Sequence, residues 1–216
     1  MIPSRSKRIF VYKMTCDNNG APCIYQSLLS LAICKPMIRK SAEKGDLIFG
    51  FGGKEFGQKL IYAAEVTETL NNYFDDNIFR NRPDCVYEKT GTEYHYIKGR
   101  EHHSQEHLEH DLGKKGVYER NRVIISRNFV YFGISAIDIA HKDQKYVRIK
   151  NLVDSMGQGH RVKHGIELYN DLLTLFNNLI TGSYPKNKYF QPHDKDPRKV
   201  CSLREDDHHF EFSSEE

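Results

Sequence analysis

Short apolar runs separated by polar turns dominate the first two thirds of the chain. These runs are rich in β-branched and aromatic residues, which is typical of strands. They predict strands at residues 8–14, 47–51, 60–66, 123–126 and 129–134. Residues 25–33 are also apolar, but their pattern has no clear period, so a strand and a short helix both remain open.

Helical spacing is clearest near the end of the chain. Residues 164–180 place apolar side chains three and four positions apart, which predicts a helix; they are Leu168, Leu172, Leu175, Phe176 and Leu179. A short helix is expected to begin near Pro36 and to stop at Gly45. Residues 68–79 also predict a helix, and residues 146–153 remain ambiguous. The inward-facing residues of the 68–79 helix would be Leu70, Tyr73, Phe74 and Ile78.

The domain organisation follows from two changes in composition. Residues 85–116 are polar and rich in histidine, which indicates a long excursion from the main fold. After Gly182 the chain becomes rich in proline, lysine, aspartate and histidine. We therefore predict one domain over residues 1–182 and a polar tail over residues 183–216, ordered only if it packs on the domain.

Composition fits a globular protein and excludes several classes. Hydrophobic residues make up 38% and charged residues 28% of the chain, and no apolar run is long enough to cross a membrane. Five cysteines occur without a disulfide-like spacing, which favours reduced structural thiols and a cytoplasmic location. The net charge of +3 does not establish nucleic-acid binding, although basic residues cluster at 5–8, 35–44 and 120–127.

A glycine-rich turn is the first candidate site. Gly50, Gly52, Gly53 and Lys54 lie between two predicted strands, where glycine lets a ligand approach the backbone and lysine offers a cation. A flat anionic ligand such as a nucleotide suits that chemistry. The spacing matches neither a P-loop nor a dinucleotide-binding pattern. A β-turn with a solvated lysine is the alternative interpretation.

Histidines form the second candidate, in residues 101–111. On a helix, His103, His107 and His110 would share one face at a spacing usable for a metal. The zinc motif H-E-x-x-H is absent, and neighbouring carboxylates suit a hydrated polar surface equally well. We predict no metal and no cofactor.

Three further groups offer ligand-binding chemistry. Gly157, Gly159 and His160 combine a free backbone with a cationic donor, and Lys35 and Arg39 place two cations near a helix start. A surface loop and a solvated helix face are the alternatives. A third group is the 129–133 strand, which can present Tyr131 on an aromatic platform for stacking. No G-x-S-x-G elbow occurs and no cysteine has a local setting typical of a nucleophile, which argues against a serine or cysteine hydrolase.

Short motifs in a fixed order resemble the nucleotide-modification-associated domain family, type two. They extend from about residue 12 to about residue 179, and their specificity comes from the ordered set. The motifs are Cys34-Lys35-Pro36, Ile38-Arg39, Gly45-Asp46, Gly50, residues 60–66, His102-His103-Ser104, residues 123–126, residues 129–133 and residues 157–161. The resemblance implies an α+β fold built on a small PUA-like, mostly antiparallel β-barrel, with flanking helices and the histidine-rich excursion.

The resemblance also implies a role near DNA-base modification and phage defence. Our first hypothesis is recognition of a modified nucleobase or nucleotide, in DNA, in a pocket where the candidate residues converge. The alternative is an enzyme, a hydrolase or transferase acting on a nucleotide or modified base, with His102, His103 or His160 as acid or base. A carboxylate, histidine or metal converging on the pocket would favour the enzyme. Expected partners are nucleic acid or nucleotide, and no membrane.

Overall fold

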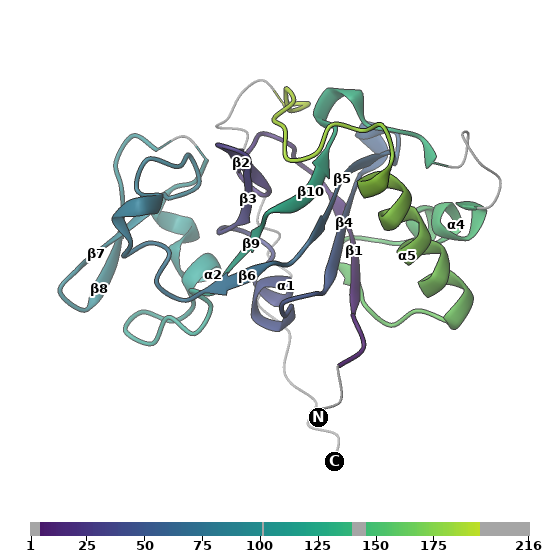
Figure 1. Ribbon diagram of the computed structural model, residues 1–216. Helices are drawn as coiled ribbons and strands as arrows, with labels where there is room; N and C mark the ends of the chain where they lie inside the picture. The colour runs from purple at the N-terminus through teal and green to yellow at the C-terminus, as the bar shows by residue number, and fades with distance from the viewer. Residues whose placement is uncertain (1–4, 101, 140–145, 195–216) are drawn as a thin grey trace, which may run out of the picture.

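A five-stranded sheet forms the centre of a mixed α+β fold (Figure 1). The computed structural model describes residues 5–100, 102–139 and 146–194. The sheet has the order β10-β5-β4-β1-β11 and is antiparallel except for the parallel pair β1–β4. Its strands are β1 (Ile9–Met14), β4 (Leu47–Gly52), β5 (Leu60–Glu65), β10 (Asn128–Tyr131) and β11 (His160–Arg161).

A second, antiparallel sheet has the order β2-β3-β9-β6. Its strands are β2 (Cys23–Tyr25), β3 (Leu28–Leu31), β9 (Val123–Ser126) and β6 (Glu68–Leu70). The ambiguous apolar run therefore belongs to a hairpin, in which Gln26 and Ser27 form the two-residue loop. Only Arg127 separates β9 from β10, so the chain crosses from one sheet to the other at that residue.

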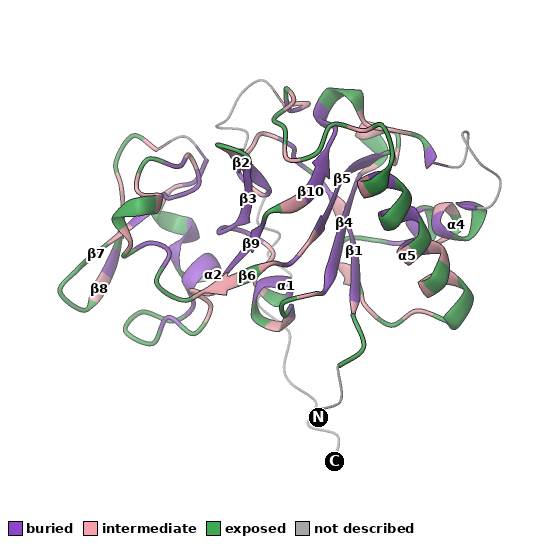
Figure 2. Ribbon diagram, viewed as in Figure 1, coloured by how far each residue is buried: buried purple, intermediate pink, exposed green. Residues whose placement is uncertain are grey.

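Helices cover the five-stranded sheet unequally. Helices α4 (Val147–Ser155) and α5 (Ile166–Thr181) pack on one face, where Phe49 contacts Phe176 edge to face. The short helix α1 (Pro36–Ser41) contributes Ile38 to the core on the other face. Both faces of the central strands are therefore buried (Figure 2). Such strands read as continuous apolar runs, and this explains why they were recognisable in the sequence.

The excursion has a core of its own. The hairpin of β7 (Tyr87–Thr90) and β8 (Glu93–Tyr96) and the helix α2 (Leu108–Leu112) lie at the left of Figure 1. Buried aromatic rings meet edge to face there, and Val123 and Ile125 connect this core to the second sheet. The polar excursion is thus a packed part of the fold.

Most predicted elements are confirmed. The strand expected at residues 8–14 is β1, the helix expected at 164–180 is α5, and β4 and β5 are adjacent antiparallel strands. Their connection contains a 3-10 turn, Lys54–Phe56. The α+β class is also correct. No closed barrel is found among the described residues, because β10 and β11 form the two edges of the main sheet.

The helix predicted at residues 68–79 is wrong. Residues Glu68–Leu70 form β6 and pair with β9, and Asn77–Phe79 form a 3-10 turn. Tyr73 and Phe74 are buried as expected, but Ile78 is 81% exposed. Pairing with β9 satisfies the backbone of the first residues, and this tertiary contact overrides a helical period.

The first part of the predicted tail packs on the domain. Lys186 forms a bridge with Val130, and the Gln191 carbonyl accepts a hydrogen bond from the Ile134 amide. Residues 195–216 of that tail, and Glu101 of the histidine-rich run, lie outside the described residues. In the described ranges, no helix is long and apolar enough to cross a membrane.

Candidate functional site

A thiol, an imidazole and a carboxylate meet inside the protein where α1 begins. The Cys34 sulfur lies 3.2 Å from His103 Nε2, and His103 Nδ1 lies 2.9 Å from Asp111 Oδ2. All three residues are buried. The Nδ1 contact is close, but the N–H direction does not satisfy a hydrogen bond, so we describe it as an ion-pair contact. We call these three residues the thiol centre.

The backbone at Cys34 fixes this arrangement. Cys34 and Lys35 both adopt left-handed conformations, with φ values of 53° and 46°, at the step from β3 to α1. Such conformations are costly outside glycine and are held by surrounding contacts. The Cys34 amide donates to Asp111 Oδ1 over 2.7 Å, and the Tyr87 hydroxyl donates to Asp111 Oδ2 over 2.8 Å. Asp111 thereby ties three segments together.

Arg39 supports the same region from the interior. Its guanidinium is fully buried and donates to the carbonyl oxygens of Cys34, Asp111, Arg120 and Arg122 at 2.6–2.8 Å. It also lies 4.0 Å from Asp111 Oδ1. Arg39 therefore joins α1, α2 and the segment before β9, and its donors point at backbone oxygens.

Electrostatics favour an ionised Asp111. Burial alone raises the pKa of this carboxyl, but the nearby His103, the Arg39 charge and the Cys34 amide together lower the pKa to about 2. Burial and then the neighbouring His103 lower the pKa of His107 below its ordinary value. The rings of His103 and His107 lie 4.5 Å apart, and His107 Nδ1 contacts the Ser104 hydroxyl at 3.0 Å.

A metal fits the thiol centre poorly. The ligand atoms of its three residues lie within 4.8 Å of one another, as a metal site requires. However, the Asp111 oxygens already accept two hydrogen bonds and face His103 Nδ1. Coordination by Asp111 would disrupt contacts that hold the fold, so the three side chains suit a thiol–imidazole–carboxylate arrangement better.

A row of polar side chains crosses the main sheet close by. Paired strands place His160 opposite Tyr12, Tyr12 opposite Gly50, Gly50 opposite Tyr62 and Tyr62 opposite Tyr131. Directly opposed residues project from the same sheet face. We call these five residues the tyrosine row. A Cβ on Gly50 would lie 2.2 Å from the Tyr62 ring, so glycine is required there to admit that ring.

Hydrogen bonds connect the row to its surroundings. The hydroxyls of Tyr12 and Tyr62 are 2.9 Å apart, and Tyr131 donates to Asp17 over 2.8 Å. The Lys35 ammonium lies 5.2 Å above the Tyr12 ring, which is a cation–π distance. Lys35 follows Cys34 directly, so the row and the thiol centre are neighbours.

Asp17 forms a second carboxylate–histidine pair at the Tyr131 end of the row. Asp17 is buried, and its Oδ2 lies 2.9 Å from His193 Nδ1 and also accepts from the His193 amide. The His193 ring packs against Phe56 at 4.8 Å. This pair fastens the C-terminal segment to the loop after β1.

The structure brings part of the predicted site together. Gly50, Tyr131 and His160 belong to the tyrosine row, Lys35 lies above it, and His103 belongs to the thiol centre. His102 packs beside Gly20 in the loop after β1.

Other predicted site residues lie elsewhere. Lys54 is exposed on the 3-10 turn, and Gly157 and Gly159 have open surroundings. Gly52 faces Phe56, and the Gly53 amide donates to the Met14 carbonyl. Tyr131 itself is buried, as are both faces of β10, so this strand presents no exposed aromatic platform.

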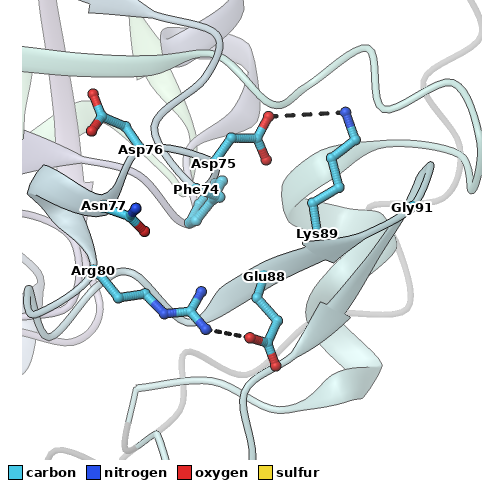
Figure 3. Close-up of a pocket in the computed structure, with 8 residues that line it drawn as sticks. All are labelled: Phe74, Asp75, Asp76, Asn77, Arg80, Glu88, Lys89 and Gly91. Atoms are coloured by element: carbon cyan, nitrogen blue, oxygen red, sulfur yellow. Dashed lines mark hydrogen bonds and ion pairs between the residues drawn. The ribbon is translucent and has the colours of Figure 1, made fainter.

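An open polar cavity of about 500 Å³ lies between residues 74–80 and the β7–β8 hairpin (Figure 3). Arg80 pairs with Glu88 across it, and Lys89 lies 3.9 Å from Asp75. None of the predicted site residues lines this cavity.

Sequence reasoning missed two of the three residues of the thiol centre. Cys34 was noted only as part of the Cys34-Lys35-Pro36 motif, and Asp111 only as the end of the histidine-rich run. Their contacts join residues 69 and 77 positions apart, so no local spacing reveals them. The ordered motif set contains Cys34 and His103, which was the available signal, but it does not contain Asp111.

Comparison with known proteins supports one family. No curated protein matches the chain, and no solved structure does. A family model described as nucleotide modification associated domain 2 matches residues 6–196, which include both sheets, the thiol centre and the tyrosine row. The chain therefore belongs to the nucleotide modification associated domain 2 family, and its role is linked to nucleotide modification.

Proposed function

We propose that this protein recognises a modified nucleobase or nucleotide, in DNA, as part of base modification or phage defence. The observation that carries the proposal is the tyrosine row with Lys35 beside it. Four members of the row bear hydroxyl or imidazole groups, and Lys35 and His160 are partly exposed at one end. That end offers the Lys35 ammonium and the His160 imidazole to a ligand.

These groups match the parts of a nucleotide. A lysine ammonium suits phosphate, and imidazole groups suit the edges of a base. A base in duplex DNA would have to leave the stack to meet them. The proposal also places the protein in the cytoplasm, where the described thiols, all buried and none in a disulfide, stay reduced.

An enzyme acting on a nucleotide or base is the second candidate. It is favoured by one observation, the thiol centre, in which a histidine and a carboxylate converge beside Lys35. Recognition and catalysis would then use adjacent parts of one site.

Binding to labelled oligonucleotides tests recognition. Single-stranded and duplex DNA, with and without 5-hydroxymethylcytosine, would be titrated by fluorescence anisotropy at several salt concentrations. We expect Lys35→Ala to weaken binding to all sequences and to reduce the salt slope by about one. We expect His160→Gln to reduce discrimination between modified and unmodified bases, because base contacts carry specificity.

Lys98→Ala is the matched control, since Lys98 is an exposed lysine on the distant β7–β8 side. It removes the same charge and should leave the affinity close to that of the unaltered protein. Equal affinities for Lys35→Ala and Lys98→Ala would contradict the site.

A further inference from the structure

We propose that Cys34 is a nucleophilic thiol, with His103 as its base and Asp111 as the positioning residue, and that it attacks an electrophilic carbon of the bound nucleotide or base. The identity of that substrate rests on the proposed function. The activation of the thiol rests on the geometry of the thiol centre alone.

The order of the three groups is the one nucleophilic catalysis requires. The nucleophile lies within hydrogen-bond reach of one imidazole nitrogen, at 3.2 Å, and the other nitrogen faces a carboxylate at 2.9 Å. This order recurs on unrelated folds and is recognised by roles and distances. Asp111 is fixed by the Cys34 amide and the Tyr87 hydroxyl, so it orients the His103 ring.

The backbone supports the same interpretation. Cys34 and Lys35 are consecutive non-glycine residues with positive φ, between a strand and a helix. Strained conformations of this kind concentrate at functional sites. Lys35 also follows the sulfur directly, where a cation can attract an anionic substrate.

Two other cysteines provide an internal comparison. Burial raises the pKa of Cys23, and it raises the pKa of Cys85 to about 11. The charge of Asp84 acts in the same direction on both thiols. We therefore expect both thiols to react more slowly than Cys34.

The proposed step is balanced in atoms and electrons. The Cys34 S–H proton moves to His103 Nε2, and a sulfur electron pair forms the S–C bond. The bond from that carbon to its leaving group breaks, and its electron pair stays with the leaving group. The leaving group then takes the proton from the His103 imidazolium.

Alkylation by iodoacetamide tests the thiol without any nucleotide. In this reaction the S–C bond forms, iodide leaves, and His103 passes the proton to water. The folded full-length chain would be treated for a series of times, and peptide mass spectrometry would follow each cysteine. We expect Cys34 to react at least about tenfold faster than Cys23 and Cys85. We expect His103→Gln to lower the alkylation rate of Cys34 by at least about tenfold.

The pH profile separates activation from simple exposure. In the unaltered chain, Cys34 should react well below pH 8.5, the ordinary pKa of a thiol, and in His103→Gln the profile should move to higher pH. The pH profile of Cys34 alkylation would also be measured in Asp111→Asn. Circular dichroism would show which variants keep the fold.

Equal alkylation of Cys34, Cys23 and Cys85 would overturn the proposal, as would an unchanged rate and pH profile in folded His103→Gln. One equivalent of zinc that leaves on Cys34→Ser would overturn it in favour of a metal site. If Cys34 is alkylated at the expected rate but the protein does not bind DNA, only the recognition proposal is rejected.

Discussion

Arg39 and Arg82 are buried, and at the scale of single residues both are held mainly by backbone oxygens. Arg82 donates to the carbonyls of Cys23, Tyr25 and Leu28 and lies 3.5 Å from Asp84. A planar guanidinium with five N–H donors can serve several carbonyls at once, which an ammonium cannot do. These two side chains therefore act as internal cross-links between distant segments.

Removing Arg39 should be costly. Arg39→Met leaves four carbonyl groups, two of them in buried contacts, without their donor, and we expect the free energy of unfolding to fall by about 3 kcal/mol or more. Urea denaturation followed by circular dichroism would measure the change. The control is Arg148→Met, which breaks an exposed pair with Asp171 and should lower the free energy of unfolding far less. Similar losses in the two variants would show that Arg39 is not a cross-link.

Gly50 should tolerate no side chain. In Gly50→Ala the new methyl group would lie 2.2 Å from the Tyr62 ring and 2.8 Å from the Met14 sulfur. We expect a loss of about 1–3 kcal/mol from overpacking in urea denaturation. Gly157→Ala is the matched control, because nothing lies within 4 Å of its Cβ position, and its stability should change by less than about 0.5 kcal/mol. An unchanged stability in Gly50→Ala would mean that the Tyr62 ring can move aside.

At the scale of elements, the β2–β3 hairpin uses unfavourable loop residues. Gln26 and Ser27 have φ values of 49° and 60°, a combination that favours Asn-Gly in a two-residue loop. We expect the double substitution Gln26→Asn, Ser27→Gly to raise the free energy of unfolding by about 1 kcal/mol. Thermal and urea denaturation would measure it. The control, Ser155→Gly in α4, should lower stability, since it places glycine in a helix. A destabilised double variant would contradict the conformational argument.

The elements also show where sequence reasoning succeeds. Strands β1, β4 and β5 are buried on both faces, so continuous apolar runs identify them, and α5 is long enough for its period to be clear. Residues Glu68–Leu70 could not be assigned in this way, because their strand exists only through pairing with β9, more than fifty residues later. The thiol centre was hidden for the same reason, since Cys34 meets its partners only in three dimensions.

At the scale of the whole molecule, three histidines couple stability to pH. Burial lowers the pKa of His107, His160 and His164 from the ordinary value of 6.5. Below pH 6.5 the unfolded chain therefore binds more protons than the folded chain. The free energy of unfolding is highest above that pH and falls as the pH drops through the lowered pKa values. We expect the urea midpoint to decrease between pH 7.5 and pH 5.5. His164→Gln should reduce this decrease, and equal midpoints at the two pH values would contradict the coupling.

The C-terminal segment provides a second test at this scale. A chain ending at Gly182 loses the Lys186 bridge to Val130 and leaves the buried Asp17 without His193. We expect it to be less stable than the full chain by at least about 3 kcal/mol in urea denaturation. His193→Ala in the full chain isolates the contribution of the Asp17–His193 pair. It should lower the free energy of unfolding less than the truncation does. A truncated chain of full stability would support a domain that ends at residue 182.

The position of β11 has a consequence for protein synthesis. Strand β1 leaves the ribosome before both of its neighbours, and one of them, β11, follows about 150 residues later. During translation β1 can pair with β4, but its other edge stays open until residues 160–161 emerge. The nascent chain therefore carries an unpaired apolar strand edge over that interval, a state in which edge pairing with other chains competes with folding.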